Sequence, residues 1–154
     1  MSSLKSKILV VATDLFQTRG INSTGVDTIV AVAGTTKMTL YKHFTSKENL
    51  ILEVLEKGHQ DFQSWLNDQL NSSAKKPSDK LQKLFEFIEE WVTSPNFRGM
   101  GFIKASAEFP NEESAVHQLS SEQSRQFRQY ISSLASEANI QDADGLALQL
   151  SLIF

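Results

Sequence analysis

Residues 24–50 read TGVDTIVAVAGTTKMTLYKHFTSKENL, and this stretch decides the fold. Apolar residues recur at helical spacing in two short segments, 26–33 and 37–44, which Gly34 separates. A glycine permits a tight turn, and the small alanines before it let two helices approach closely. The outward face of the second segment is polar. The pattern predicts a helix-turn-helix, whose second helix can enter the major groove of DNA.

Helical periodicity continues on both sides of this stretch. The expected helices cover about 3–18, 26–33, 37–44, 46–70, 79–92, 101–109 and 113–138, with a last one after Asp142. Glycines at 20 and 34 are expected to end the first two helices. The expected fold is therefore all-α, with a three-helix head that contains the helix-turn-helix and a helical-bundle body.

Polar residues mark where these helices begin. Thr24, with Asp27 three residues later, resembles a capping box for the first short helix, and Thr36 is the expected N-cap of the second. The long helix that follows can be capped in two ways. The cap is either Ser46 alone or Thr45 paired with Glu48 three residues later.

Composition narrows the class of protein. The 154 residues are 40% hydrophobic and contain no cysteine, which excludes disulfides, thiolate metal sites and cysteine nucleophiles. The early apolar run, 8–12, is too short for a signal peptide or membrane span, so we expect a cytoplasmic protein without membrane contact. Residues 1–50 hold six basic and three acidic side chains, and residues 51–154 hold nine basic and fifteen acidic. A basic head on an acidic body can orient a protein on DNA.

A family resemblance follows from the fixed positions in the head. ILVVATDLFQTRG at 8–20, followed by residues 24–50 with TLYKHF-x-SKE-x-L, resembles the DNA-binding domain of the TetR family. FRGMGFIKASAEFP at 97–110 is similar to a segment in one branch of that family. The resemblance implies a DNA-binding domain over 1–46, a ligand-binding and dimerisation domain over 47–154, and a homodimer that a small-molecule inducer releases from its double-stranded DNA operator.

The resemblance also implies DNA contacts. The start of the recognition helix would read base edges, Tyr41, His43 and Lys47 match positions that contact phosphates, and Lys42 suits either role. The full set is Thr24, Thr36, Lys37, Met38, Thr39, Tyr41, Lys42, His43 and Lys47. Tyr41 can also be read as a core aromatic, and His43 and Lys47 as solvated side chains. Thr35, Thr36, Met38 and Gly25 depart from the residues common in the family, which leaves the operator sequence open.

Aromatic residues lie on several helices of the body, where bundle cavities commonly bind ligands. The expected lining residues are Phe62, Trp65, Leu66, Phe85, Ile88, Trp91, Ile103 and Phe127, although aromatic stripes also form plain core. Few charges on the inner stripes favour an apolar or aromatic ligand. Glu108 and His117 are isolated and make no metal-ligand set, so we expect neither metal nor cofactor.

These observations predict a ligand-responsive repressor on a palindromic operator. The chain shows no phosphate loop, no nucleophile elbow and no carboxylate pair in a plausible cleft, so we do not expect an enzyme. The alternative is a DNA-binding dimer without a ligand, regulated through protein contacts. For the ligand-responsive protein, the long fourth helix is the expected route from the cavity to the head.

The last helix is apolar almost all round. Leu146, Leu150 and Ile153 share one face, Leu148 and Leu152 another, and the chain stops at Phe154 without a helix-ending signal. We expect one of these faces to pack on the preceding helix and the other to await a partner. The pattern suggests a body truncated at its C-terminus, with an ordinary frayed end as the alternative.

Overall fold

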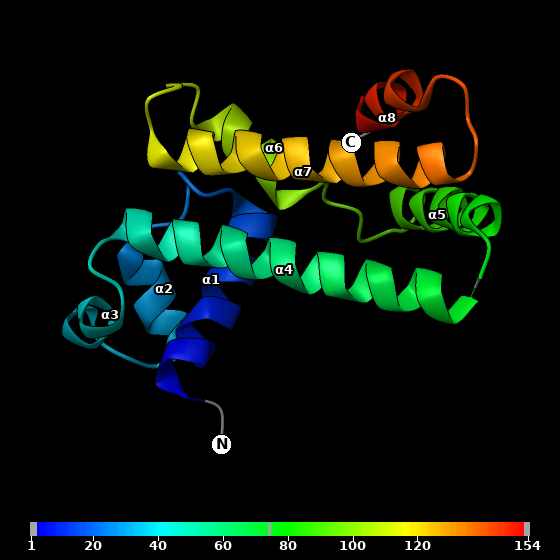
Figure 1. Cartoon of the computed structure of the whole chain (residues 1–154). Coiled ribbons are helices and arrows are strands. Elements are labelled where there is room, and N and C mark those ends of the chain that lie inside the picture. Colours follow the sequence, from blue (N-terminus) through cyan, green and yellow to red (C-terminus); the bar gives the residue numbers. More distant parts are fainter. Residues whose placement is uncertain (1–2, 74, 153–154) are drawn as a thin grey trace.

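The structure is a computed structural model that describes residues 3–73 and 75–152. Within these ranges it contains eight helices and no strand (Figure 1). The all-α prediction is confirmed, and the helix ends lie within three residues of those expected. The helices are α1 Leu4–Arg19, α2 Val26–Ala33, α3 Lys37–His43, α4 Lys47–Ser73, α5 Pro77–Val92, α6 Gly101–Glu108, α7 Ala115–Glu137 and α8 Ala143–Ser151.

The helices form two groups that share one long helix. Figure 1 shows α1, α2 and α3 gathered at one end of α4 and α5 and α8 toward its other end, while α7 runs alongside α4. Helix α6 lies behind α7 in this view and packs against both α7 and α4. We call α1–α3 the head and the remainder the body.

Two glycines end α1 and α2, and two hydroxyls cap the beginnings of α3 and α4. Gly20 and Gly34 end α1 and α2 with φ of +89° and +65°, a region that glycine enters without strain. The Thr36 hydroxyl accepts a hydrogen bond from the Thr39 backbone N–H at 3.2 Å, which confirms Thr36 as N-cap. Ser46 accepts from the Asn49 N–H at 3.0 Å and so caps α4 alone.

The capping box expected at Thr24 is wrong. The N-cap of α2 is Gly25, which has no side chain to accept a hydrogen bond. Thr24 is fully buried, and its hydroxyl donates to the Gly20 carbonyl at 2.7 Å. The threonine therefore closes the turn after α1 instead of starting α2.

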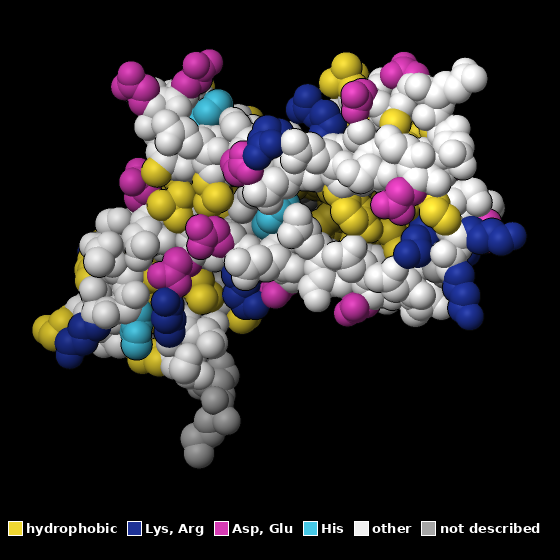
Figure 2. All heavy atoms as spheres, in the orientation of Figure 1, with side chains coloured by type: hydrophobic (Ala, Val, Ile, Leu, Met, Phe, Trp, Pro, Cys, Tyr) yellow, Lys and Arg dark blue, Asp and Glu magenta, His cyan; other side chains and the backbone are white. Residues whose placement is uncertain are grey.

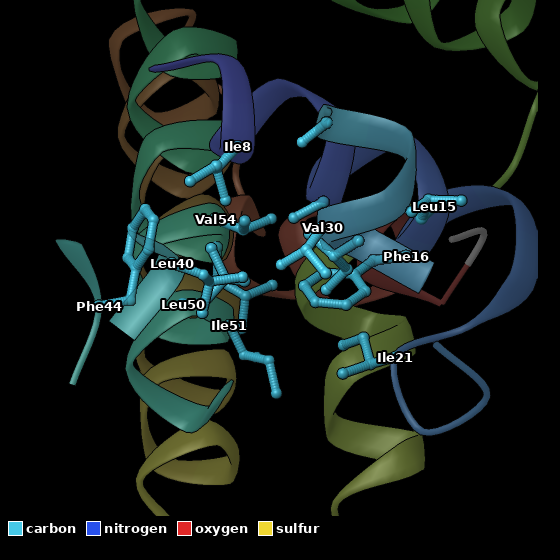
Figure 3. Packing of buried hydrophobic residues seen from close by; sticks show 14 of the residues in the cluster. Ile8, Leu15, Phe16, Ile21, Val30, Leu40, Phe44, Leu50, Ile51 and Val54 are labelled. Carbon is cyan, nitrogen blue, oxygen red and sulfur yellow. The ribbon is translucent and has the colours of Figure 1, made fainter. Parts of the chain in front are cut away.

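The core of the head extends into the body. Figure 3 shows Leu40 and Phe44, at the end of the helix-turn-helix, beside Leu50 and Ile51 of α4. The cluster also takes in Ala105 of α6 and residues of α1, α2 and α7. Burial of these apolar surfaces is the main source of stability, so the head is attached to α4 by its core.

The second core lies within the body. It joins Leu66 and Leu70 of α4 to apolar residues of α5, α6, α7 and α8. Helix α5 packs on both α4 and α7. Ala147 and Leu150 bury one face of α8, while Leu148 and Leu152 stay exposed, as expected. Ile153 and Phe154 lie outside the described residues.

None of the helices formed by residues 3–73 and 75–152 combines the length and apolar character that a membrane crossing needs.

Replacing Phe44 tests the head core. The ring has no exposed surface, and the Lys5 ammonium lies 5.3 Å from its centroid. We expect Phe44→Ala to lower the free energy of unfolding by about 3–5 kcal/mol, because a large cavity replaces the ring. Met38→Ala, on the exposed side of α3, is the control and should change it little. Urea titration followed by helical circular dichroism measures both, and equal values for the two variants contradict this core.

Candidate nucleic-acid interface and body cavities

Helix α3 presents a polar and polarisable face to solvent. Leu40 is the buried residue of this helix, and together with Phe44 it holds α3 against the core. On the opposite side Lys37, Lys42 and His43 are exposed, as are Met38 at 72% and Tyr41 at 46%. Figure 2 shows basic and histidine side chains gathered at this tip of the molecule. A short helix held in this way can offer its whole outer face to a groove.

The beginning of α3 is ordered by local contacts. The Thr36 and Thr39 hydroxyls lie 3.0 Å apart, and the Lys37 ammonium forms an ion pair with the Asp27 carboxylate at 2.9 Å. The hydrogen bond to Asp27, reinforced by its charge, raises the pKa of Lys37. In the free protein this lysine is therefore held by α2.

Two of the expected DNA contacts lie away from this face. The buried Thr24 hydroxyl faces the Gly20 and Leu15 carbonyls, so its side chain is not presented at the surface, and that assignment is corrected. Lys47 is half-buried, and its ammonium donates to the Ile21 carbonyl at 2.9 Å. Burial lowers the pKa of Lys47, and the negative charge of Glu108 opposes this effect.

A cavity of about 570 Å³ lies between α4, α5 and α7, and we call it the aromatic cavity. Figure 2 shows hydrophobic side chains in a recess between α4 and α7. Phe62 lies among the other rings, with centroids 6.1 Å from Trp65, 6.1 Å from Trp91 and 5.8 Å from Phe127. Six expected residues line this cavity: Phe62, Trp65, Leu66, Ile88, Trp91 and Phe127.

The other two expected lining residues are not part of the wall. Phe85 is 39% exposed on α5, and Ile103 of α6 packs against the body core. Their apolar character favoured both residues, but the rotation of their helices turns them away from the cavity. Met100 and Phe87, which line the cavity, were missed although their apolar character was visible in the sequence.

A smaller cavity of about 190 Å³ lies where the head meets the body, and we call it the junction cavity. Phe16, Gln17 and Ile21 from the head line one side of it. His59 lines it too, with Nε2 at 3.0 Å from Gln126 Oε1. Its Nδ1 atom is buried and has no hydrogen-bond partner among the described residues.

A second polar side chain lies in the wall of the junction cavity. Gln123 is buried, and its amide nitrogen donates to the Leu55 carbonyl at 3.1 Å. Gln123 is a polar residue among the apolar positions of α7. This break in the pattern is the sequence signal that could have indicated the cavity. The junction cavity thus combines apolar walls with polar groups, as ligand sites do.

Comparison with known proteins shows which family the sequence of this chain resembles. Residues 8–54 match the family described as bacterial regulatory proteins, tetR family. The transcriptional regulator QacR of Staphylococcus aureus is 42% identical over 69 residues, 44% of this chain and 37% of that protein. The transcriptional regulator AcrR of Shigella flexneri is 33% identical over 119 residues, 74% of this chain and 54% of that protein.

Solved structures extend the likeness to the body. A TetR-family transcriptional regulator from Streptomyces coelicolor superposes with a TM-score of 0.89 at 28% identity, covering 97% of this chain and 78% of that one. The chain thus has the architecture of helix-turn-helix transcriptional regulators. It belongs to the TetR family. It spans about two fifths of the length of the first curated relatives it matches, 37% and 40%.

The ion pair at the start of α3 gives a test that needs no DNA. Asp27→Asn should lower the pKa of the Lys37 ammonium, because the hydrogen bond and charge that favour its protonated form are lost. Nuclear magnetic resonance titration of the lysine side chains measures the shift. Asp14→Asn, an exposed acid on α1, removes the same charge and should leave Lys37 unchanged. A Lys37 pKa that responds equally to both variants contradicts the pair.

Proposed function

We propose that this protein is a ligand-responsive repressor of transcription. It would bind a palindromic operator in double-stranded DNA as a homodimer and leave it when a small apolar or aromatic molecule enters the body. The observation that carries the DNA-binding part is the exposed outer face of α3, held in place by Leu40 and Phe44. Such a protein acts in the cytoplasm and performs no catalysis.

The α3 face suits the chemistry of the major groove. Lys37 and Lys42 can donate to base acceptors or phosphates, and the exposed Met38 can contact a thymine methyl group. Thr36 and Thr39, at the start of the helix, lie where recognition helices reach base edges. Tyr41 and His43 can contact phosphates beside the groove that α3 enters. Lys37 would exchange its Asp27 partner for DNA, and Lys47 would have to release the Ile21 carbonyl.

The aromatic cavity supports a small-molecule ligand. Its volume of about 570 Å³ falls in the range of about 300–1,000 Å³ common for ligand sites. Aromatic rings dominate its wall, which suits an apolar or aromatic molecule. A body packed without a cavity would instead favour the alternative, regulation through protein contacts alone. Dimerisation is supported by the apolar side chains that α8 leaves exposed, Leu148 and Leu152.

The salt dependence of DNA binding tests the α3 face. The DNA is a duplex that the unmodified protein selects from a random library. If Lys42 contacts a phosphate, Lys42→Ala should lower the slope of log affinity against log salt by about 0.9, because one fewer counterion is released. Lys75→Ala changes an exposed lysine beyond the far end of α4 and is the control. Equal affinities for the two variants at every salt concentration contradict a Lys42–DNA contact.

A neutral fluorescent amine, N-phenyl-1-naphthylamine, tests the aromatic cavity. We expect saturable binding to the unmodified protein. Phe62→Ala should weaken it about 2–12-fold, because aromatic contacts contribute about 0.5–1.5 kcal/mol beyond area burial. Phe85→Ala removes an identical side chain that does not line the cavity and should have little effect. If Phe85→Ala weakens binding as much as Phe62→Ala, the probe binds elsewhere.

A further inference from the structure

His59 of α4 lines the junction cavity and has one ring nitrogen that the function proposed above does not use. This Nδ1 atom is buried and has no hydrogen-bond partner among residues 3–73 and 75–152. Phe102 of α6 packs edge-on against the imidazole, with ring centroids 6.2 Å apart and ring planes at 82°. A buried polar atom without a partner is costly, so this nitrogen indicates a site that a further molecule completes.

Hydrogen bonds from α7 decide how the Gln126 amide is oriented beside this ring. The Glu122 carboxylate accepts from the Arg125 guanidinium at 2.6 Å and from the Gln126 side-chain nitrogen at 2.8 Å. These bonds from Arg125 and Gln126 lower the pKa of Glu122, so the carboxylate is ionised and can only accept. The amide nitrogen of Gln126 must therefore point to Glu122, and the amide oxygen to His59.

The Gln126 amide in turn fixes the tautomer of His59. Gln126 Oε1 lies 3.0 Å from His59 Nε2, and an amide oxygen can only accept a hydrogen bond. Nε2 must then carry the hydrogen, which leaves Nδ1 of the neutral imidazole as an acceptor. The polarity of the unpartnered nitrogen thus follows from a carboxylate two hydrogen bonds away. Glu122 and Gln126 act on the cavity through His59, so they are positioning residues.

Three other polar side chains of the cavity wall already use a donor on a backbone carbonyl. The Thr13 hydroxyl donates to a carbonyl of α1 at 2.8 Å, and the Lys104 ammonium to another at 2.9 Å. The Gln123 amide nitrogen donates to a carbonyl of α4. No acidic side chain of the described residues is part of this wall. The unsatisfied group is the acceptor on His59, which favours a ligand that donates.

The size of the junction cavity limits this ligand to about one ring. Its volume is about 190 Å³, and an apolar protein cavity of about 150 Å³ is large enough to bind benzene. Phe16, Phe62 and Phe102 are part of the wall, so aromatic surface is available for a ring to pack against. A six-membered ring with one hydroxyl group therefore matches both the volume and the acceptor.

We propose that the junction cavity binds a one-ring hydroxyl compound of the phenol class, whose hydroxyl group donates to His59 Nδ1. Entry of the ligand turns the imidazole slightly toward the cavity, because Nδ1 is covered in the free protein. The inference rests on the proposed function, since it names the chemical class of a ligand for the body. It adds a second site beside the aromatic cavity, with which the junction cavity shares Phe62, Trp91 and Met100.

Nitrogen-15 magnetic resonance of the histidine rings tests the tautomer without a ligand. The two tautomers of a neutral imidazole give different nitrogen shifts, and we expect His59 to show the form with hydrogen on Nε2. Gln126→Met removes the acceptor for that hydrogen and should produce a mixture of both forms. Gln129→Met makes the same change at an exposed position of α7 and should leave the His59 signals unchanged.

Phenol and toluene test the ligand class, because they have nearly the same shape and only phenol has a hydroxyl donor. Binding is followed through the side-chain amide signals of Gln123, which lines the cavity. We expect both probes to bind, and the ratio of phenol affinity to toluene affinity to fall about 2–12-fold in His59→Phe, the value of one net hydrogen bond. Gln126→Met should lower this ratio too and serves if His59→Phe does not fold, whereas Gln129→Met should not change it.

Three results overturn the proposal: a His59 ring with its hydrogen on Nδ1, probes that leave the Gln123 signals unperturbed, or a phenol-to-toluene ratio that His59→Phe does not lower. If the unmodified protein selects no duplex, the proposed function fails, while these measurements still decide whether the junction cavity selects a hydroxyl compound.

Discussion

The three helices of the head depend on α4 to close their core. Leu40 and Phe44 have no exposed surface, and Leu50 and Ile51 from the first turns of α4 pack in the same cluster (Figure 3). Every other property of the head follows from this packing. The buried side of α3 is fixed against the core, so its outer face points to solvent. The position of that face relative to the body depends on the contacts that α4 and α6 make with the head.

Hydrophobic periodicity was enough to predict the helices and the outer face of α3. Local signals were less reliable at the turn before α2. Thr24 has the residue type and spacing of an N-cap, but its hydroxyl is used inside the turn after α1, and Gly25 takes the cap position. A capping pattern in sequence does not distinguish a hydroxyl that starts one helix from one that closes the turn after another, because both lie between the same two helices.

Contacts between distant residues could not be predicted from the sequence. Glu108 and Ile21 are separated by 87 positions, and no periodicity connects them. Segment 97–110 could be singled out, but the partner of its glutamate depends on how α6 crosses the end of α1. The same applies to Phe85 and Ile103, whose exclusion from the aromatic cavity is decided by helix rotation. Residue type predicted an aromatic cavity, and packing decided which rings line it.

We propose that the outer face of α3 reads DNA. The chain contains no cysteine, so Met38→Cys creates a single attachment point for an iron chelate that cleaves nearby DNA. On the selected duplex we expect two sets of cuts placed symmetrically about the centre of the site, one from each protomer. The same chelate attached through Lys75→Cys, away from α3, should give none. Cuts from position 75 with none from position 38 would show that α3 does not face the DNA.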